Sequence, residues 1–237
     1  MKTKNYLLLF IILLLVNACQ KPHNGTSYQT LGTFNSSGLP NNLLKDTISP
    51  TFLSFVDSIL PNGQDLRISH PEFFNNVAIG DIVITQPSDV YITFVHGVSG
   101  FTNAIAYYTY TTYQPPTSAA DLKLITYAFP NAGLYTSLLP GDKVNIGKFS
   151  AGTSVGIVLM QNSWDLSTHA LNNNVARFFT TDALNPETDP NLKKHAILIN
   201  YAPENKLLIG FEDTDRSSTL CDNDFNDVVL YCTVTPD

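Results

Sequence analysis

The chain has 237 residues, with 13 Lys or Arg against 20 Asp or Glu, which gives a formal net charge of −7 at pH 7. This acidic balance argues against nucleic acid and anionic lipid surfaces as partners. Only 14% of the residues are charged, and the abundance of Thr, Asn, Tyr, Phe, Pro and Gly favours strands and turns over helices.

The N-terminus has the pattern of an export signal. Two lysines precede an apolar run over residues 6–16, which is shorter than the ~20 residues that a bilayer requires. Residues Leu15–Cys19 resemble the lipobox of bacterial lipoproteins, although Val16 stands where leucine is usual. The resemblance implies cleavage of residues 1–18 as a signal peptide, acylation of Cys19 by fatty acids such as palmitate, and stable anchoring in the membrane. An ordinary signal peptide or a buried first helix is the alternative.

Processing at that site would leave two cysteines besides the acylated Cys19, namely Cys221 and Cys232. It would also remove two lysines and no acids, so the mature formal charge becomes 11 − 20 = −9. Because disulfides persist in exported proteins, a bridge between Cys221 and Cys232 is predicted, with two free buried thiols as the alternative. No third or fourth soft ligand accompanies them at the spacing of a thiolate metal site.

A spacer and one short helix are expected next. Residues 19–48 are polar, with Gly, Ser, Asn and Pro throughout, and are predicted to be a flexible spacer. Ser49 can cap a helix, Pro50 suits its first position, and apolar residues recur three and four apart as far as Leu60. Pro61-Asn62-Gly63 ends this helix, whose apolar face is expected to pack on a sheet or to contact a partner.

From Val77 onward the sequence predicts an all-β protein. Short apolar or alternating runs are separated by turn residues such as Gln86-Pro87-Ser88-Asp89. The expected strands cover residues 82–84, 90–94, 104–113, 122–129, 143–149, 153–160, 195–201, 206–211 and 228–234. Such a series of short strands indicates a β-sandwich or jelly-roll-like fold. Residues 49–147 are expected to pack with residues 148–237 as one unit.

Six carboxylates crowd into sixteen positions near the C-terminus, within residues 210–215 and 222–227. They repel one another unless a cation or an arginine compensates them. The second group alternates as the start of an EF-hand calcium loop does, but Asp227 stands where glycine is required and Thr233 where glutamate is required. The segment is therefore not an EF-hand. A different geometry stays open, in which two strand-edge loops converge and offer oxygen ligands to Ca²⁺.

These residues resemble the signature of DUF4114, a β-rich domain of unknown function found in secreted and surface bacterial proteins. The similarity rests on Gly210–Asp213 and Asp222–Val229, and it covers roughly residues 148–234. The resemblance implies a β-sandwich and bound Ca²⁺, and it offers no established reaction.

A ligand set follows from this resemblance. The side chains it implies for Ca²⁺ are those of Glu212, Asp213, Asp222, Asp224 and Asp227. Asp182 and Asn185 are weaker candidates from a neighbouring loop, whereas Asn226 could fix the turn through the backbone. A solvated acidic turn without an ion is the alternative.

Aromatic residues suggest a second kind of site. Four tyrosines, from Tyr107 to Tyr113, share one predicted strand in which exposed rings could stack on sugars. Neighbouring strand residues point to opposite faces, so at least one of Tyr107 and Tyr108 is expected to pack inward. Tyr108, Tyr110 and Trp164 are the candidate glycan contacts, with ordinary core packing as the alternative.

Hydrolytic chemistry has little support in the sequence. Ser99 lies between glycines, but a nucleophile elbow needs a helix after the serine and a strand is predicted here. His70, His169 and His195 each lack a second histidine at metal spacing. Paired carboxylates for glycoside cleavage stay open, because their separation in space cannot be read from sequence.

The sequence therefore predicts a non-enzymatic lipoprotein of the bacterial cell envelope. It is expected on the surface or periplasmic face of the outer membrane, with a Ca²⁺-stabilised β-sandwich used for adhesion or ligand binding. A glycan or a cell-surface protein is the expected partner. A glycan-binding lipoprotein of a polysaccharide uptake system is the alternative, and a hydrolase is the third.

Overall fold

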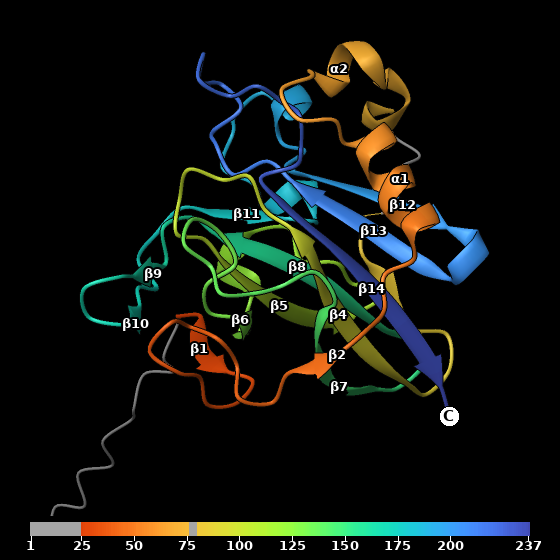
Figure 1. The fold of residues 1–237 in the computed structure, drawn as a ribbon, viewed down its shortest axis with the longest axis vertical. Coiled ribbons are helices and arrows are strands. Elements are labelled where there is room, and N and C mark those ends of the chain that lie inside the picture. Colours follow the sequence, from red (N-terminus) through yellow and green to blue (C-terminus); the bar gives the residue numbers. More distant parts are fainter. Residues whose placement is uncertain (1–24, 76–79) are drawn as a thin grey trace, which may run out of the picture.

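The computed structural model describes residues 25–75 and 80–237, and its secondary structure is mostly β. Two six-stranded sheets form the body of the molecule (Figure 1), which confirms the predicted all-β sandwich. The predicted signal peptide and Cys19 lie outside the described residues. Within the described ranges, no helix is long and apolar enough to cross a bilayer.

The first sheet has the strand order β1-β6-β5-β8-β11, with β3 pairing to β8. Its strands are β1 (Ser27–Thr30), β3 (Ile82–Val83), β5 (Ala104–Thr111), β6 (Leu124–Phe129), β8 (Thr153–Met160) and β11 (Arg177–Phe179). β3 and the long strands of this sheet were predicted from their patterns, whereas the short strands β1 and β11 were not.

The second sheet has the strand order β12-β13-β14-β4-β7-β2. Its strands are β2 (Leu44–Lys45), β4 (Ser88–His96), β7 (Asp142–Phe149), β12 (Ala196–Tyr201), β13 (Lys206–Phe211) and β14 (Val228–Pro236). A separate small hairpin pairs β9 (Trp164–Asp165) with β10 (Ala170–Leu171).

The helical elements are short. They are α1 (Pro50–Ile59), α2 (Leu66–Ser69) and the 3₁₀ turns η1 (Pro71–Phe74), η2 (Ala119–Asp121), η3 (Asp182–Leu184), η4 (Pro190–Leu192) and η5 (Ala202–Glu204). The predicted helix is α1, and its start is confirmed because the Ser49 hydroxyl accepts a hydrogen bond from the Phe52 amide at 3.0 Å.

The main core lies between the sheets, and strand alternation explains its composition. On β14, Leu230 and Cys232 face this core, whereas Val229 and Tyr231 face outward beneath α1. Phe52 of α1 packs in that outer cluster and meets the Tyr231 ring edge-on at 5.3 Å. Both faces of β14 are therefore buried, which explains why this strand reads as a nearly continuous apolar run.

Residues 25–48 do not form the flexible spacer that was predicted. β1 pairs in parallel with β6, and β2 pairs antiparallel with β7, so this segment contributes an edge strand to each sheet. Leu31, Leu39 and Leu43 pack against the main core. The polar composition suggested a linker, but edge strands are held by backbone hydrogen bonds that composition does not reveal.

The two ends of the molecule differ (Figure 1). β1 and β2 lie at the end from which the described chain begins, and the loop between β13 and β14 lies beside α2 at the other end. The acidic residues belong to that second end, far from the start of the described chain.

Candidate metal centre

The acidic segment is the loop between β13 and β14, which are neighbouring antiparallel strands. Phe211 pairs with Val228, so Glu212 leaves β13 opposite Asp227, which leads into β14. The Asp227 amide donates to the Phe211 carbonyl at 3.1 Å, and the Asp213 amide donates to the Asp227 carboxylate at 2.8 Å. The strand register therefore brings the two halves of the acidic signature together.

A close approach between the loop and β13 explains the glycine of the signature. A Cβ atom at Gly210 would lie 2.4 Å from the Phe225 carbonyl oxygen, which is too close for any other residue. Phe225 adopts a left-handed backbone conformation (φ 57°), and its side chain is buried in the cluster under α1 and α2. The Gly63 amide, just after α1, donates to the Asp224 carboxylate at 2.7 Å. The helical segment and the sheet thus hold the loop from both sides.

Five carboxylates converge in this loop, and they are the five that the sequence predicted. They form two groups of three that share Glu212, and within each group the ligand atoms lie within 4.8 Å of one another. The groups are Glu212, Asp222 and Asp224, and Glu212, Asp213 and Asp227. Glu212, Asp213 and Asp224 are buried, so their charges are poorly screened by water.

The environment opposes negative charge on this cluster. Burial, together with the neighbouring charges of Asp222 and Asp213, raises the pKa of Glu212 to about 7. Burial also raises the pKa of Asp227 and of Asp224, and like charges add to both shifts. None of the ion pairs found in residues 25–75 and 80–237 involves any of these five acids. No ion pair in these ranges therefore compensates the cluster.

One oxygen of the shared residue is also without a hydrogen bond. Glu212 Oε2 is buried and has no partner, although its residue is only 1% exposed. A buried unpaired carboxylate oxygen costs about 1–3 kcal/mol. Ca²⁺ takes oxygen ligands, mainly from carboxylates. An ion bound at Glu212 would coordinate Oε2 and would also compensate the repulsion between the carboxylates. The donor set fits a hard divalent cation.

Neutral donors orient one of the acids. Asn103 Nδ2 donates to the Asp213 carboxylate at 2.5 Å, and the Ser99 hydroxyl donates to the same carboxylate oxygen. Ser99 thus forms part of the hydrogen-bond network around the acidic cluster. The sequence reasoning missed both residues as part of the site, because the loop after β4 reaches the cluster only through the fold.

A buried histidine supports the first residue of the loop. His195 Nδ1 donates to the Glu212 carbonyl at 3.0 Å, and its Nε2 pairs with Glu187 at 2.6 Å. Its ring stacks on Phe178 with centroids 4.1 Å apart. The sequence pattern presented His195 only as an isolated histidine without a metal partner, and it did not indicate Glu187, which lies eight residues earlier.

Asp182 and Asn185, the weaker ligand candidates, do not join the acidic cluster. Asn185 is buried and bonds the backbone of Phe179 and Lys193, while Asp182 pairs with Lys194 at 2.9 Å. The backbone turn at Asn226 is fixed by Asp224, whose carboxylate accepts from the Asn226 amide at 3.0 Å.

The predicted disulfide is absent, because Cys221 and Cys232 are both free thiols. Cys221 lies in the acidic loop, whereas Cys232 lies inside β14 opposite Leu207 and faces the main core. The loop leaves β14 at Val228, so Cys232 is four residues, or about 13 Å, further along the strand. Cys232 is therefore carried along the strand away from the end that joins the loop and packs in the main core, and the two thiols stay unbridged.

The predicted glycan platform is mostly internal. Tyr108 and Trp164 are each 2% exposed, so their rings cannot stack on a sugar from solvent. The Tyr108 hydroxyl bonds Thr181 at 2.6 Å. Tyr110 is half-buried, and its hydroxyl donates to Asp81 at 2.6 Å. The interpretation of Tyr108 and Trp164 as glycan contacts is wrong, because Tyr108 packs against Phe179 and Trp164 packs against Phe34 and His169.

Comparison with protein families matches residues 149–235 to the Domain of unknown function (DUF4114). The chain contains a DUF4114 domain. In the fold, the DUF4114 stretch begins at the end of β7 and supplies strands to both sheets, together with the whole acidic loop. β4 to β7 complete the same sheets from the preceding part of the chain. No curated protein and no solved structure matches the chain.

Proposed function

We propose that this protein is a non-enzymatic, lipid-anchored envelope protein whose β-sandwich binds Ca²⁺ at Glu212 and uses the stabilised end for ligand binding or adhesion. The observation that supports it best is the buried, unpartnered Oε2 of Glu212, which lies in both groups of acids. Carboxylates that repel one another without a countercharge are the arrangement that a divalent cation stabilises.

The ion would act on structure. Glu212 and Asp227 border the ends of β13 and β14, while Asp222 and Asp224 belong to the part of the loop that packs against the helical segment. A cation shared by these groups would hold the loop on the sheet. Because the folded state would bind Ca²⁺ and the unfolded state would not, the ion would stabilise the fold by mass action.

Lipid anchoring at Cys19 would determine which end of the β-sandwich lies nearest to the membrane. If Cys19 carries the lipid, only residues 20–24 separate it from the described chain, and they reach at most about 20 Å. The sandwich would then stand close to the bilayer with β1 and β2 nearest to it, and the acidic loop would face away (Figure 1). A ligand or a neighbouring cell surface would meet that loop first.

Calorimetric titration of the purified protein with Ca²⁺ tests the metal site. We expect one saturable event with a Kd on the order of 0.1–1 mM, as in extracellular calcium modules. Glu212→Gln removes the shared ligand and should weaken binding at least tenfold. Asp57→Asn makes a comparable change at an exposed acid on α1 and should leave binding unaltered. The absence of saturable binding to the native protein, or equal binding by Glu212→Gln, would contradict the proposal.

A further inference from the structure

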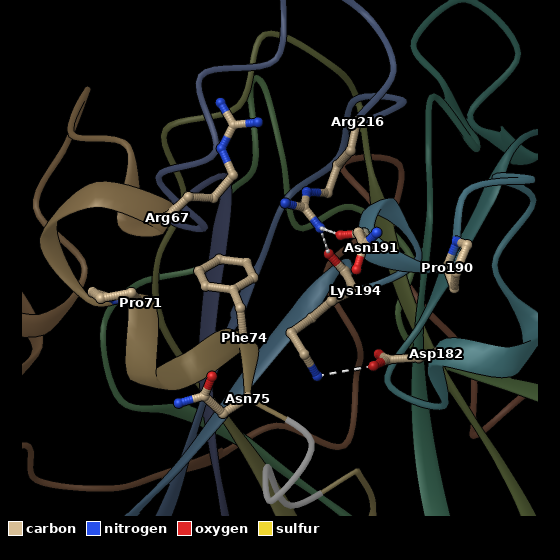
Figure 2. Close-up of a pocket in the computed structure, with 9 residues that line it drawn as sticks. All are labelled: Arg67, Pro71, Phe74, Asn75, Asp182, Pro190, Asn191, Lys194 and Arg216. Atoms are coloured by element: carbon tan, nitrogen blue, oxygen red, sulfur yellow. Dashed lines mark hydrogen bonds and ion pairs between the residues drawn. The ribbon is translucent and has the colours of Figure 1, made fainter.

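A second charged site lies beside the metal centre, in a cavity of about 310 Å³ (Figure 2). Its walls carry three cationic side chains, Arg67, Lys194 and Arg216, with Asp182 as the one acid and Phe74 as the aromatic ring. The formal charge of the lining is therefore 3 − 1 = +2, in a protein whose net charge is −7. A cationic cavity on an acidic protein is a local feature that the overall charge does not explain.

Arg216 is the most unusual of these residues, because its guanidinium is buried and held in place. It is only 3% exposed. Its Nε donates to Asn223 Oδ1 at 2.9 Å, and its Nη1 donates to the Lys194 carbonyl at 2.9 Å. The guanidinium carbon lies over the rings of Phe74 and Phe225, at 5.2 and 5.4 Å from their centroids. The group is thus fixed before any ligand arrives.

One nitrogen of this fixed guanidinium makes no hydrogen bond. Nη2 of Arg216 is buried and has no hydrogen-bond partner, which is rare for a buried polar nitrogen. The Asn223 side chain explains the placement of Nε, the Lys194 carbonyl explains that of Nη1, and the two rings explain the plane of the group. None of these contacts serves Nη2, and the same side chain lines the cavity.

Among the described residues, Arg216 also lacks an ion pair. Arg67 pairs with Asp65 at 2.6 Å and Lys194 pairs with Asp182 at 2.9 Å, whereas no carboxylate forms an ion pair with Arg216 in the described parts of the chain. Residues 1–24 and 76–79 contain no Asp or Glu. Burial disfavours this charge, and Glu212 and Glu187 attract it without contacting it, so an anion bound in the cavity would supply the direct partner that the guanidinium lacks.

We propose that this cavity binds a small molecule through an oxyanion, either a carboxylate or a phosphate. Arginine is the side chain best suited to planar oxyanions, because its N–H groups form a rigid fork. The Nη2 of Arg216 would donate to the anion, and Lys194, whose carbonyl accepts from Arg216, would add a second charge on the same side of the cavity (Figure 2). Phe74, with Pro71 and Pro190, supplies an apolar surface for the remainder of the ligand. The cavity is at the small end of ligand sites, which favours a monosaccharide-sized or smaller molecule.

This site is distinct from the metal centre, although the two share a loop. Asn223, which holds Arg216, lies between the proposed ligands Asp222 and Asp224. The anion is nevertheless bound by groups that are already in place without an ion. Oxyanion binding therefore does not rest on calcium binding, and measurements with Ca²⁺ and with a chelator separate the two.

The test is calorimetric titration with two anions and one neutral probe, in Ca²⁺ and in chelator. The probes are benzoate for a carboxylate, inorganic phosphate for a phosphate, and benzyl alcohol as the uncharged match of benzoate. We expect saturable binding of at least one anion, with a Kd on the order of 1 mM, and no saturable binding of benzyl alcohol. The anion that binds more tightly identifies which oxyanion the site prefers.

Three variants assign the binding to the cavity. Arg216→Gln should weaken anion binding at least tenfold, and Lys194→Gln should weaken it about threefold. Lys148→Gln makes the same change in charge at an exposed lysine on β7 and should have no effect. If Arg216→Gln does not fold, as circular dichroism would reveal, Lys194→Glu decides, because reversing this charge should abolish binding. The proposal is overturned if neither anion binds, if benzyl alcohol binds as tightly as benzoate, or if the Lys194 variants bind as the native protein does.

Discussion

The loop between β13 and β14 carries two buried charges of opposite sign that do not pair with each other. Glu212 lies among four other acids and has an oxygen without a partner. Arg216, four residues later, lies among carbonyls and aromatic rings and has a nitrogen without a partner. The same loop therefore presents one site suited to a cation and one suited to an anion.

The two sites differ in how they tolerate their charge. A carboxylate can accept a proton, and burial together with its neighbours raises the pKa of Glu212 to about 7. A guanidinium stays charged at any ordinary pH. Arg216 cannot lose its charge, and it is held by hydrogen bonds to the Lys194 carbonyl and to Asn223. The acidic site should therefore respond to pH and metal, whereas the cationic site should be a fixed part of the fold.

The largest expected effect is the loss of Arg216. Arg216→Ala leaves the Asn223 side chain and the Lys194 carbonyl without their donor and removes the group packed on Phe74, so we expect about 3 kcal/mol of destabilisation. Urea denaturation measures it. Arg67→Ala is the matched control, because Arg67 is partly exposed and its ion pair with Asp65 is worth less than about 1 kcal/mol. Equal losses in the two variants would show that Arg216 is not the fixed element described above.

A smaller effect should distinguish the acidic site by pH. Between about pH 4.5 and pH 7 the folded state keeps a proton on Glu212 that the unfolded state has released. In chelator, the protein therefore loses the stability contributed by this group as pH rises through that range. We expect the native protein to lose about 2 kcal/mol relative to Glu212→Gln over this range. Denaturation curves of the two proteins at pH 5, 6 and 7 give the difference. A difference that stays constant with pH would mean that Glu212 is ionised throughout.

Local sequence signals were sufficient for the regular parts of this fold. Ser49 and Pro50 mark the start of α1, and alternation marks the long strands. The acidic residues could be grouped because their chemistry is repeated within one short loop. The edge strands β1 and β2 escaped notice because they are short and mostly polar, and the backbone pairing that defines them leaves no mark in composition.

Signals that depend on distant contacts could not be read. Tyr108 is a good strand residue on either face, and only the packing of Phe179 and Thr181 against it makes it internal. Cys221 and Cys232 are close in sequence, but β14 carries the second away from the first. The role of Arg216 depends on carbonyls from the segment before β12, which its own neighbours in sequence do not indicate.

The thermal midpoint of the purified protein at pH 7, measured in millimolar Ca²⁺ and in chelator, tests the central claim most directly. If an ion binds the folded state at Glu212, we expect Ca²⁺ to raise the midpoint by about 5 °C in the native protein and to leave it unchanged in Glu212→Gln. A native midpoint that is the same in Ca²⁺ and in chelator would contradict the account of this loop as a metal centre.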